Sequence, residues 1–122
     1  MGYVYVLTNK NKTTLYIGVT NNLLRRLYEH VKTPKPGSFP DQYNLVHLVY
    51  AEAQPTMIEA IAREKQLKRW SRKKKDALIS NANPEWVDLA VWEDGYELPE
   101  ITLPEKLHMP LFPKKPGWDK SD

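Results

Sequence analysis

The sequence of 122 residues contains no cysteine, and this excludes a disulfide framework, a thiolate metal site and a cysteine nucleophile. It also lacks an apolar run long enough for a signal peptide or a membrane span, since the N-terminus leads directly into a strand pattern. The length suits one domain with a modest core and a tail, but not two domains. We therefore expect a cytoplasmic protein that does not associate with membranes.

Acidic residues are scarce in the first 80 positions. Residues 1–80 contain 14 lysines and arginines but only 6 aspartates and glutamates, a net charge of +8, whereas residues 81–122 contain 4 against 9, a net charge of −5. A polyanion is the natural partner of so basic a segment. The simpler alternative is that the lysines form a solvated helix face that binds nothing.

The stretch YVYVLTNKNKTTLYIGV, residues 3–19, predicts a β-hairpin with aliphatic side chains on one face and tyrosines on the other. A tight turn at residues 10–11 would place Tyr5 directly opposite Tyr16. The tyrosine face would then offer paired phenols beside Gly18, which suits the binding of a ligand. Aromatic cross-strand pairs also stabilise sheets by themselves, so the hairpin alone leaves both interpretations open.

Helical and strand patterns alternate after the hairpin. Residues 21–31, 56–70 and 73–82 have helical periodicity, and residues 44–53 form an aliphatic, β-branched strand after a Pro/Gly-rich loop. The order β-β-α-β-α-α predicts an α+β fold class, with a small three-stranded antiparallel sheet that is flanked by helices.

The pattern changes beyond about residue 91. Residues 92–122 contain five prolines and no sustained periodicity, so we expect a domain of residues 1–91 and an irregular, Pro-rich, acidic C-terminal extension of residues 92–122. The extension would wrap around the domain or remain mobile, and it could cover part of the basic surface. Its segment PLFPKKPGW also permits a protein partner to dock on it, as in an adaptor.

One acidic residue interrupts the apolar face of the long helix. On a helical wheel Glu64 falls in the middle of an arc that is formed by Met57, Ile58, Ala60, Ile61 and Leu67. A carboxylate that faces the core needs a cation, because its burial alone would be costly. That cation could be a hard divalent metal ion, with phosphate oxygens and waters completing its shell, or a neighbouring lysine or arginine.

The first helix carries Arg26 and His30, which lie four residues apart and therefore share one face. At one edge of the apolar stripe, the arginine would offer a permanent positive charge that can bind phosphate. The histidine would offer a group that titrates near neutral pH. Such residues are common on exposed helices, so the pair gains meaning only beside the tyrosines and Glu64. Together these groups supply the base, the charge clamp and the metal ligand that phosphodiester cleavage needs.

Four features occur in a fixed order: YVY, then YIG one hairpin later, then Arg26 eight residues after Gly18, then a glutamate on a later helix. This set resembles the GIY-YIG nuclease domain over about residues 3–89, although the first triplet keeps only its tyrosine. The likeness is strongest to small, single-domain bacterial members, through LYIGVTNNLLRRLYEH, AIAREKQLKRW and NPEW. The resemblance implies a DNA endonuclease that depends on Mg²⁺ or Mn²⁺.

The resemblance also implies roles for individual residues. Tyr5 would activate or position the attacking water, Tyr16 would hydrogen-bond around the scissile phosphate, and Gly18 would leave room for substrate. Arg26 would stabilise the developing charge, and His30 would assist proton transfer or orient the water. Further along the chain, the metal ligand would be Glu64 and the downstream polar residue that contacts substrate would be Asn83. The choice among Tyr5, Tyr16 and His30 as the general base stays open.

Basic residues crowd the end of the long helix and the start of the next. The residues expected to contact DNA phosphates are Lys68, Arg69, Arg72 and Lys73. No base-reading motif is present, so we expect selectivity for branched or single-stranded DNA instead of sequence specificity. Trp70 could stack on an unpaired base, although packing against the core is its simpler role.

The nuclease hypothesis requires Tyr5, Tyr16, Arg26, His30 and Glu64 to converge on one cavity. The main alternative is a nucleic-acid-binding module with the same fold, which is catalytically weak or needs a partner domain. Cleavage that depends on metal would favour the enzyme, whereas binding without cleavage would favour the module.

Overall fold

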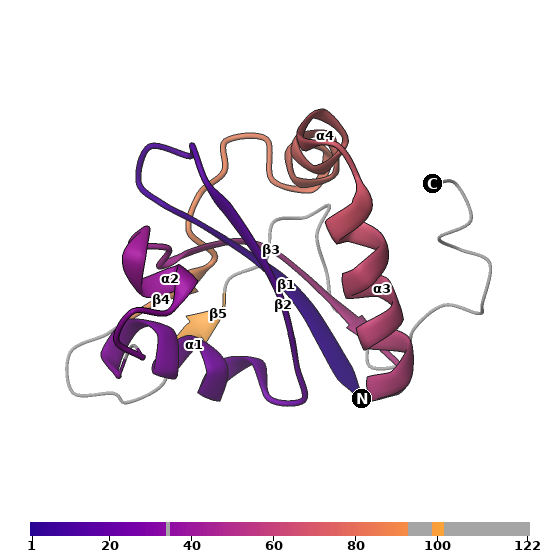
Figure 1. Cartoon of the computed structure of the whole chain (residues 1–122), viewed down its shortest axis with the longest axis horizontal. Coiled ribbons are helices and arrows are strands. Elements are labelled where there is room, and N and C mark those ends of the chain that lie inside the picture. The colour runs from indigo at the N-terminus through magenta and orange to yellow at the C-terminus, as the bar shows by residue number, and fades with distance from the viewer. Residues whose placement is uncertain (34, 93–98, 102–122) are drawn as a thin grey trace.

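The computed structural model describes residues 1–33, 35–92 and 99–101, and its centre is a three-stranded antiparallel sheet with strand order β2-β1-β3 (Figure 1). The strands of this sheet are β1 (Gly2–Thr8), β2 (Leu15–Thr20) and β3 (His47–Gln54). The helices are α1 (Leu23–Lys32), α2 (Phe39–Gln42), α3 (Met57–Arg69) and α4 (Arg72–Ala82). Two short strands, β4 (Ala90–Val91) and β5 (Glu100–Ile101), pair in a second sheet. The predicted α+β fold class is confirmed.

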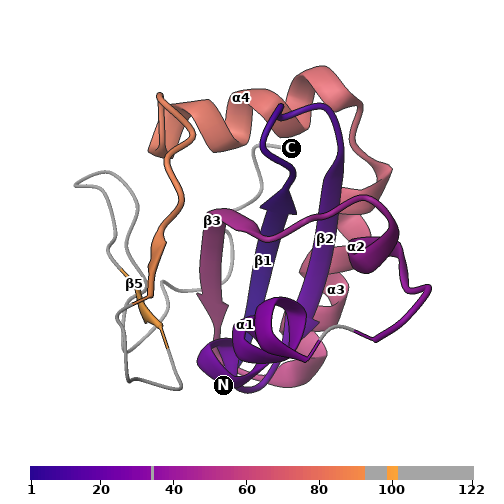
Figure 2. The same ribbon diagram turned by 90° about the vertical axis from the view of Figure 1, so that its left-hand side faces the viewer.

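Helices cover both faces of the central sheet, with α1 on one face and α3 on the other (Figures 1 and 2). Alternation along β1 explains this arrangement. Tyr5 points toward α1 and contacts His30 there. Gly2 faces the opposite side of the sheet. It packs so closely on α3 that a Cβ added to it would lie 2.6 Å from Cβ of Ala60. Because both faces are covered, the oppositely directed side chains of Val4 and Tyr5 are both fully buried.

The hairpin register differs from the predicted one by two residues. Tyr5 lies opposite Gly18 instead of Tyr16. The predicted tight turn is a longer loop over residues 9–14, in which Oδ1 of Asn9 accepts hydrogen bonds from two backbone N–H groups at 2.9 and 3.2 Å. A shift of two residues keeps each side chain on its face, so the predicted separation of tyrosine and aliphatic faces is preserved.

The inward face of α3 is rotated relative to the predicted one. Its buried residues are Ala60, Arg63 and Leu67. Ile58, which the predicted apolar arc includes, is 81% exposed. Arg63 can face the core because Glu52 of β3 meets it there, with Nε of Arg63 3.1 Å from Oε1 of Glu52. The acid that is paired with a cation in the core is therefore Glu52. Glu64 is less deeply buried and pairs with Lys68, which is the lysine alternative that the sequence leaves open.

Part of the predicted C-terminal extension belongs to the described residues. Residues 100–101 pair with residues 90–91, and Trp92 packs against the core. The division into residues 1–91 and 92–122 stays a prediction, and the segment PLFPKKPGW lies outside the described residues. Every helix in the described part of the chain is too short or too polar to cross a bilayer.

Candidate active site

Tyr5 of β1 lies at the centre of the candidate site. Its side chain is fully buried and lies directly over Gly18 of β2, where an added Cβ would be 2.4 Å from both Cζ and Oη of the tyrosine. The sequence predicts that Gly18 leaves room for substrate, and the structure corrects this interpretation. The ring of Tyr5 fills the space above Gly18, so the absence of a side chain there is required for the position of the phenol.

His30 of α1 forms a hydrogen bond with Tyr5, with Nε2 2.9 Å from Oη. Burial, together with the neighbouring Tyr16, raises the pKa of Tyr5 above its ordinary value. Burial, together with the charge of Arg26, lowers the pKa of His30. These directions favour the uncharged form of both side chains at neutral pH.

A cavity of about 360 Å³ lies beside this pair, between α1 and α2. Its lining includes Tyr16, Arg26, His30, Lys35 and Asp41. The ring centroid of Tyr16 is 5.7 Å from that of His30. Tyr5 does not line the cavity itself, but its hydroxyl is hydrogen-bonded to His30, which does.

Arg26 supplies positive charge at the wall of the cavity. Its Nε is 3.2 Å from Oε1 of Glu29, and the two side chains are 40% and 48% exposed. An ion pair exposed to this degree contributes little free energy, so the guanidinium can leave Glu29 for a bound phosphate. Arginine also matches the geometry of phosphate with two parallel N–H groups.

The structure thus brings together the four residues that the sequence predicts to be catalytic, Tyr5, Tyr16, Arg26 and His30. The uncharged imidazole can accept a proton, the hydroxyl of Tyr16 can donate a hydrogen bond, and the guanidinium can neutralise an oxyanion. This combination suits chemistry at a phosphate group.

Glu64 does not line this cavity. It belongs to α3, on the face of the sheet opposite to α1, and its Oε2 is 3.3 Å from Nζ of Lys68. The side chain of Glu64 is 14% exposed, and that of Lys68 is 52% exposed. Glu64 is therefore not one of the residues that line this cavity, and its convergence with the other four residues stays a prediction.

Arg72, one of the four basic residues predicted to contact DNA, has a structural role. Its guanidinium donates hydrogen bonds to the backbone carbonyls of residues 12 and 13, both at 2.8 Å, and to Oδ1 of Asp76 at 2.7 Å. These bonds tie α4 to the hairpin loop, and because the side chain of Arg72 is also exposed, its contact with DNA stays a prediction. The other three, Lys68, Arg69 and Lys73, are exposed.

Asn83 also has a structural role. The side chain is 1% exposed, and its Nδ2 donates to the backbone carbonyls of Val49 at 3.1 Å and Val87 at 3.0 Å. Its Oδ1 accepts a hydrogen bond from the N–H of Val87 at 3.2 Å. The amide joins β3 to the segment that follows α4, and this corrects the predicted contact with substrate.

Comparison with known families decides the family of the chain. The model of the GIY-YIG catalytic domain matches residues 1–76, which contain the hairpin, α1 and α3. The chain belongs to the GIY-YIG family. The resemblance found in the sequence is therefore confirmed, and the family is one of nucleases.

Individual relatives of this GIY-YIG protein carry the name UPF0213 protein. The chain is 37% identical to one from Syntrophus aciditrophicus over 83 residues, which cover 68% of this chain and 93% of the relative. It is 35% identical to one from Clostridium perfringens over 103 residues, which cover 84% of this chain and all of the relative. A solution NMR structure of the UPF0213 protein of Bacillus halodurans is similar with 31% identity and a TM-score of 0.46, covering 72% of this chain and 93% of that one.

GIY-YIG nucleases generally use a divalent metal ion. Glu64 fits such an ion by its chemistry, because carboxylate oxygen is a ligand that Mg²⁺ prefers and the lysine beside it is half exposed and easily displaced. Within the described ranges, no group of three or more histidines, aspartates and glutamates is arranged to hold a metal ion. Glu64 would therefore be a single protein ligand, and substrate and water would complete the shell.

Sequence reasoning missed two residues of the GIY-YIG domain near the cavity, Phe39 and Tyr43. They lie in a segment that the sequence predicts to be a loop but that contains α2. The ring of Phe39 stacks on Tyr16, with a centroid distance of 6.3 Å and an interplanar angle of 29°. The signal that could have revealed α2 is Ser38, an N-cap residue, followed by Pro40 in the first helical turn.

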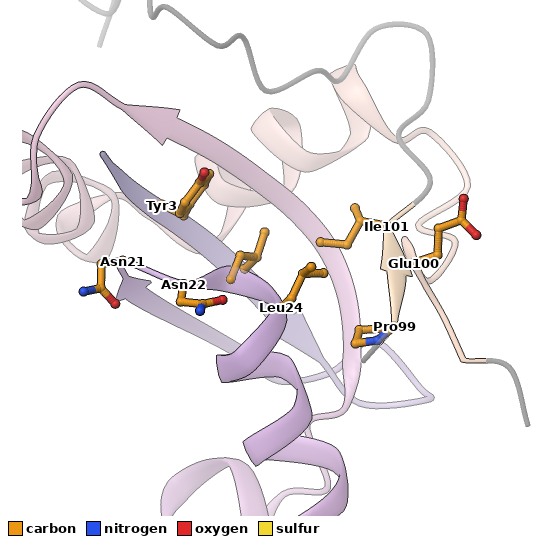
Figure 3. Close-up of a pocket in the computed structure, with 8 residues that line it drawn as sticks. Tyr3, Asn21, Asn22, Leu24, Pro99, Glu100 and Ile101 are labelled. Carbon is orange, nitrogen blue, oxygen red and sulfur yellow. The ribbon is translucent and has the colours of Figure 1, made fainter. Parts of the chain in front are cut away.

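A second cavity, of about 550 Å³, lies at the N-terminal end of α1 (Figure 3). Its lining is largely apolar and includes Tyr3, Leu23, Leu24 and Ile101. Among the described residues, its lining contains no histidine, lysine or arginine. Because it lacks the groups that act on phosphate, we place the candidate active site of this GIY-YIG domain at the cavity beside His30.

Proposed function

We propose that the protein is a metal-dependent endonuclease that hydrolyses phosphodiester bonds in DNA and selects its substrate by structure instead of sequence. The observation that carries the proposal is the cluster of Tyr16, Arg26 and His30 on one cavity, with Tyr5 behind it. Membership of a nuclease family supports the same reaction class.

In the proposed reaction His30 is the general base. We assign the proton of the uncharged imidazole to Nε2, so that Nε2–H donates to Oη of Tyr5 at 2.9 Å and Nδ1 is free to accept a proton from the attacking water. His30 is preferred over Tyr5 because His30 lines the cavity, whereas Tyr5 is fully buried and has a raised pKa. Tyr5 is thus a positioning residue that holds the imidazole of His30 in place.

Tyr16 and Arg26 would bind the scissile phosphate. The hydroxyl of Tyr16 donates a hydrogen bond to one phosphate oxygen, and the guanidinium of Arg26 stabilises the negative charge that grows as water attacks. Glu64 would hold Mg²⁺ or Mn²⁺, and the ion would supply positive charge to the leaving oxygen.

The proposal is tested with purified protein and a fluorescently labelled, flapped DNA in the presence of Mg²⁺ or EDTA. We expect cleavage with Mg²⁺ and none with EDTA. Glu64→Gln is expected to raise the Mg²⁺ concentration needed for half-maximal cleavage, because the amide is a weaker ligand than the carboxylate. Glu59→Gln makes the same change at an exposed position of α3 and is the matched control. Cleavage in EDTA, or an equal response of both variants to Mg²⁺, would contradict the role of Glu64.

The second candidate function is a nucleic-acid-binding module without useful catalysis. It is favoured by the ion pairs that occupy Glu64 and Arg26, with Lys68 and Glu29 respectively. The same assay separates the two functions. Binding to DNA without cleavage at any Mg²⁺ or Mn²⁺ concentration would support the module.

A further inference from the structure

The described part of the chain has only two exposed aromatic side chains, and both lie at α2. Phe39 is 46% exposed and Tyr43 is 48% exposed, whereas the other described aromatic residues are buried or half-buried. Single exposed apolar residues are ordinary on protein surfaces. Two aromatic rings side by side in a small protein are a stronger signal, because their burial would have stabilised the core.

The two rings continue a row of ring contacts that begins at the candidate active site, with Phe39 stacked on Tyr16 and Tyr43 tilted by 40° against Phe39. The ring of Phe39 lies 6.3 Å from that of Tyr16, and the ring of Tyr43 lies 4.7 Å from that of Phe39. Tyr16 lines the cavity beside His30. The row of aromatic rings therefore runs from the phosphate-binding groups to the surface.

The polypeptide around α2 holds these rings in place. Oγ of Ser38 caps the helix, and Oδ2 of Asp41 accepts a hydrogen bond from the N–H of Gly37 at 3.0 Å. The N–H of Leu45 donates to the carbonyl of Pro40 at 2.9 Å, and Pro40 itself is buried. A surface that is built in this way can accept a flat partner without first becoming ordered.

An unpaired nucleobase is the partner that fits this position. Bases of single-stranded DNA stack on aromatic side chains irrespective of sequence, whereas the faces of paired bases in a duplex are covered by their neighbours. Arg26 and Lys35 at the cavity offer positive charge for the adjoining phosphate. Trp70 is less suited to the same role, because it is half-buried and Nζ of Lys74 lies 4.2 Å from its ring centroid.

We propose that Phe39 and Tyr43 form a stacking platform for an unpaired base next to the scissile phosphate, so that the protein selects single-stranded or flapped DNA. The proposal rests on the proposed nuclease function, and it specifies the substrate class of the same site. The platform accounts for selection by structure without any contact to the hydrogen-bonding edges of the bases.

The test measures binding in EDTA, where no cleavage occurs, by fluorescence anisotropy of a short labelled single-stranded DNA and of its blunt duplex. Phe39→Leu keeps an apolar side chain but removes the aromatic face. We expect it to weaken binding of the single strand by about 5- to 150-fold and to change duplex binding by less than about twofold. Phe39→Tyr is expected to bind as the native protein does.

Ile58→Ala is the matched control, because Ile58 is an exposed apolar residue on α3 and is 81% exposed. It should change neither affinity, and thermal melting verifies that each variant is folded. Unchanged binding of the single strand by Phe39→Leu would overturn the platform, and so would an equal loss for single strand and duplex. If the native protein cuts no DNA but Phe39→Leu loses single-strand binding, the nuclease proposal fails and the platform stands as a binding site.

Discussion

Replacement of His30 by glutamine is expected to lower the single-turnover rate of DNA cleavage by about 10²- to 10⁴-fold, the usual contribution of a general base. Glutamine can still donate a hydrogen bond to Oη of Tyr5, so the packing around the 2.9 Å contact is largely retained. It cannot take a proton from water. DNA affinity, measured in EDTA, should stay close to that of the native protein, which separates loss of chemistry from loss of binding.

The pH dependence of cleavage gives this prediction a second readout. The base must be unprotonated, so the rate falls as the pH drops through the pKa of His30. Because burial and Arg26 lower that pKa, the fall is expected below about pH 6.5, the ordinary value for histidine. In His30→Gln the small residual rate should lose this acid limb. An unchanged acid limb in the variant would show that another group is the base.

Arg63→Ala is expected to destabilise the protein by about 3–5 kcal/mol, the usual cost of removing one partner from a buried ion pair. Glu52 is 5% exposed, and its carboxylate accepts hydrogen bonds from Arg63, from Oη of Tyr50 at 3.0 Å and from Nε2 of Gln54 at 2.7 Å. Without the guanidinium, a negative charge would stay in the core between β3 and α3. Urea denaturation measures the change in the free energy of unfolding.

Two control variants define the origin of that loss. Arg69→Ala removes an exposed arginine from the same helix and is expected to change stability by less than about 0.5 kcal/mol. The double variant Glu52→Leu, Arg63→Leu removes both charges, so it should be more stable than Arg63→Ala. A double variant as unstable as Arg63→Ala would show that packing, and not the unpaired carboxylate, causes the loss.

The fold could be predicted from the sequence because its main signals are local. Alternation of tyrosine and aliphatic residues assigns the faces of the hairpin, and this assignment tolerates the two-residue error in register. Arg26 and His30 lie on the same face of α1, because helix geometry alone brings residues four apart to one face. The meeting of the tyrosine pair with the Arg26–His30 pair is not local, and it follows from the resemblance to the GIY-YIG domain.

The errors concern contacts between segments far apart in the sequence. A helical wheel shows which face of α3 is apolar, but not that Glu52 of β3 meets it, and this ion pair turns Arg63 inward and leaves Ile58 exposed. The hydrogen bonds of Asn83 to Val49 likewise depend on the packing of the whole chain. The sequence pattern of a single helix or strand does not show which residue of a distant segment will contact it.

The role of Gly18 is not predictable from the hairpin sequence for a related reason. A glycine beside tyrosines on a hairpin is compatible with two arrangements. It can leave space for a ligand, or it can leave space for the ring of a neighbouring tyrosine. Only the register, with Tyr5 opposite Gly18, shows that the ring occupies the space. The same packing buries Tyr5, which is why we propose His30 as the base among the three residues that the sequence leaves open.

The most direct test of the account is a double-mutant cycle on the single-turnover cleavage rate with Tyr5→Phe and His30→Gln. Tyr5→Phe keeps the ring over Gly18 and removes only the hydroxyl that holds Nε2 of His30. If Tyr5 acts through His30, Tyr5→Phe should slow cleavage by the native protein and have no further effect in the His30→Gln background. Losses that simply add on a logarithmic scale would contradict the account, because they would mean that the two residues act independently.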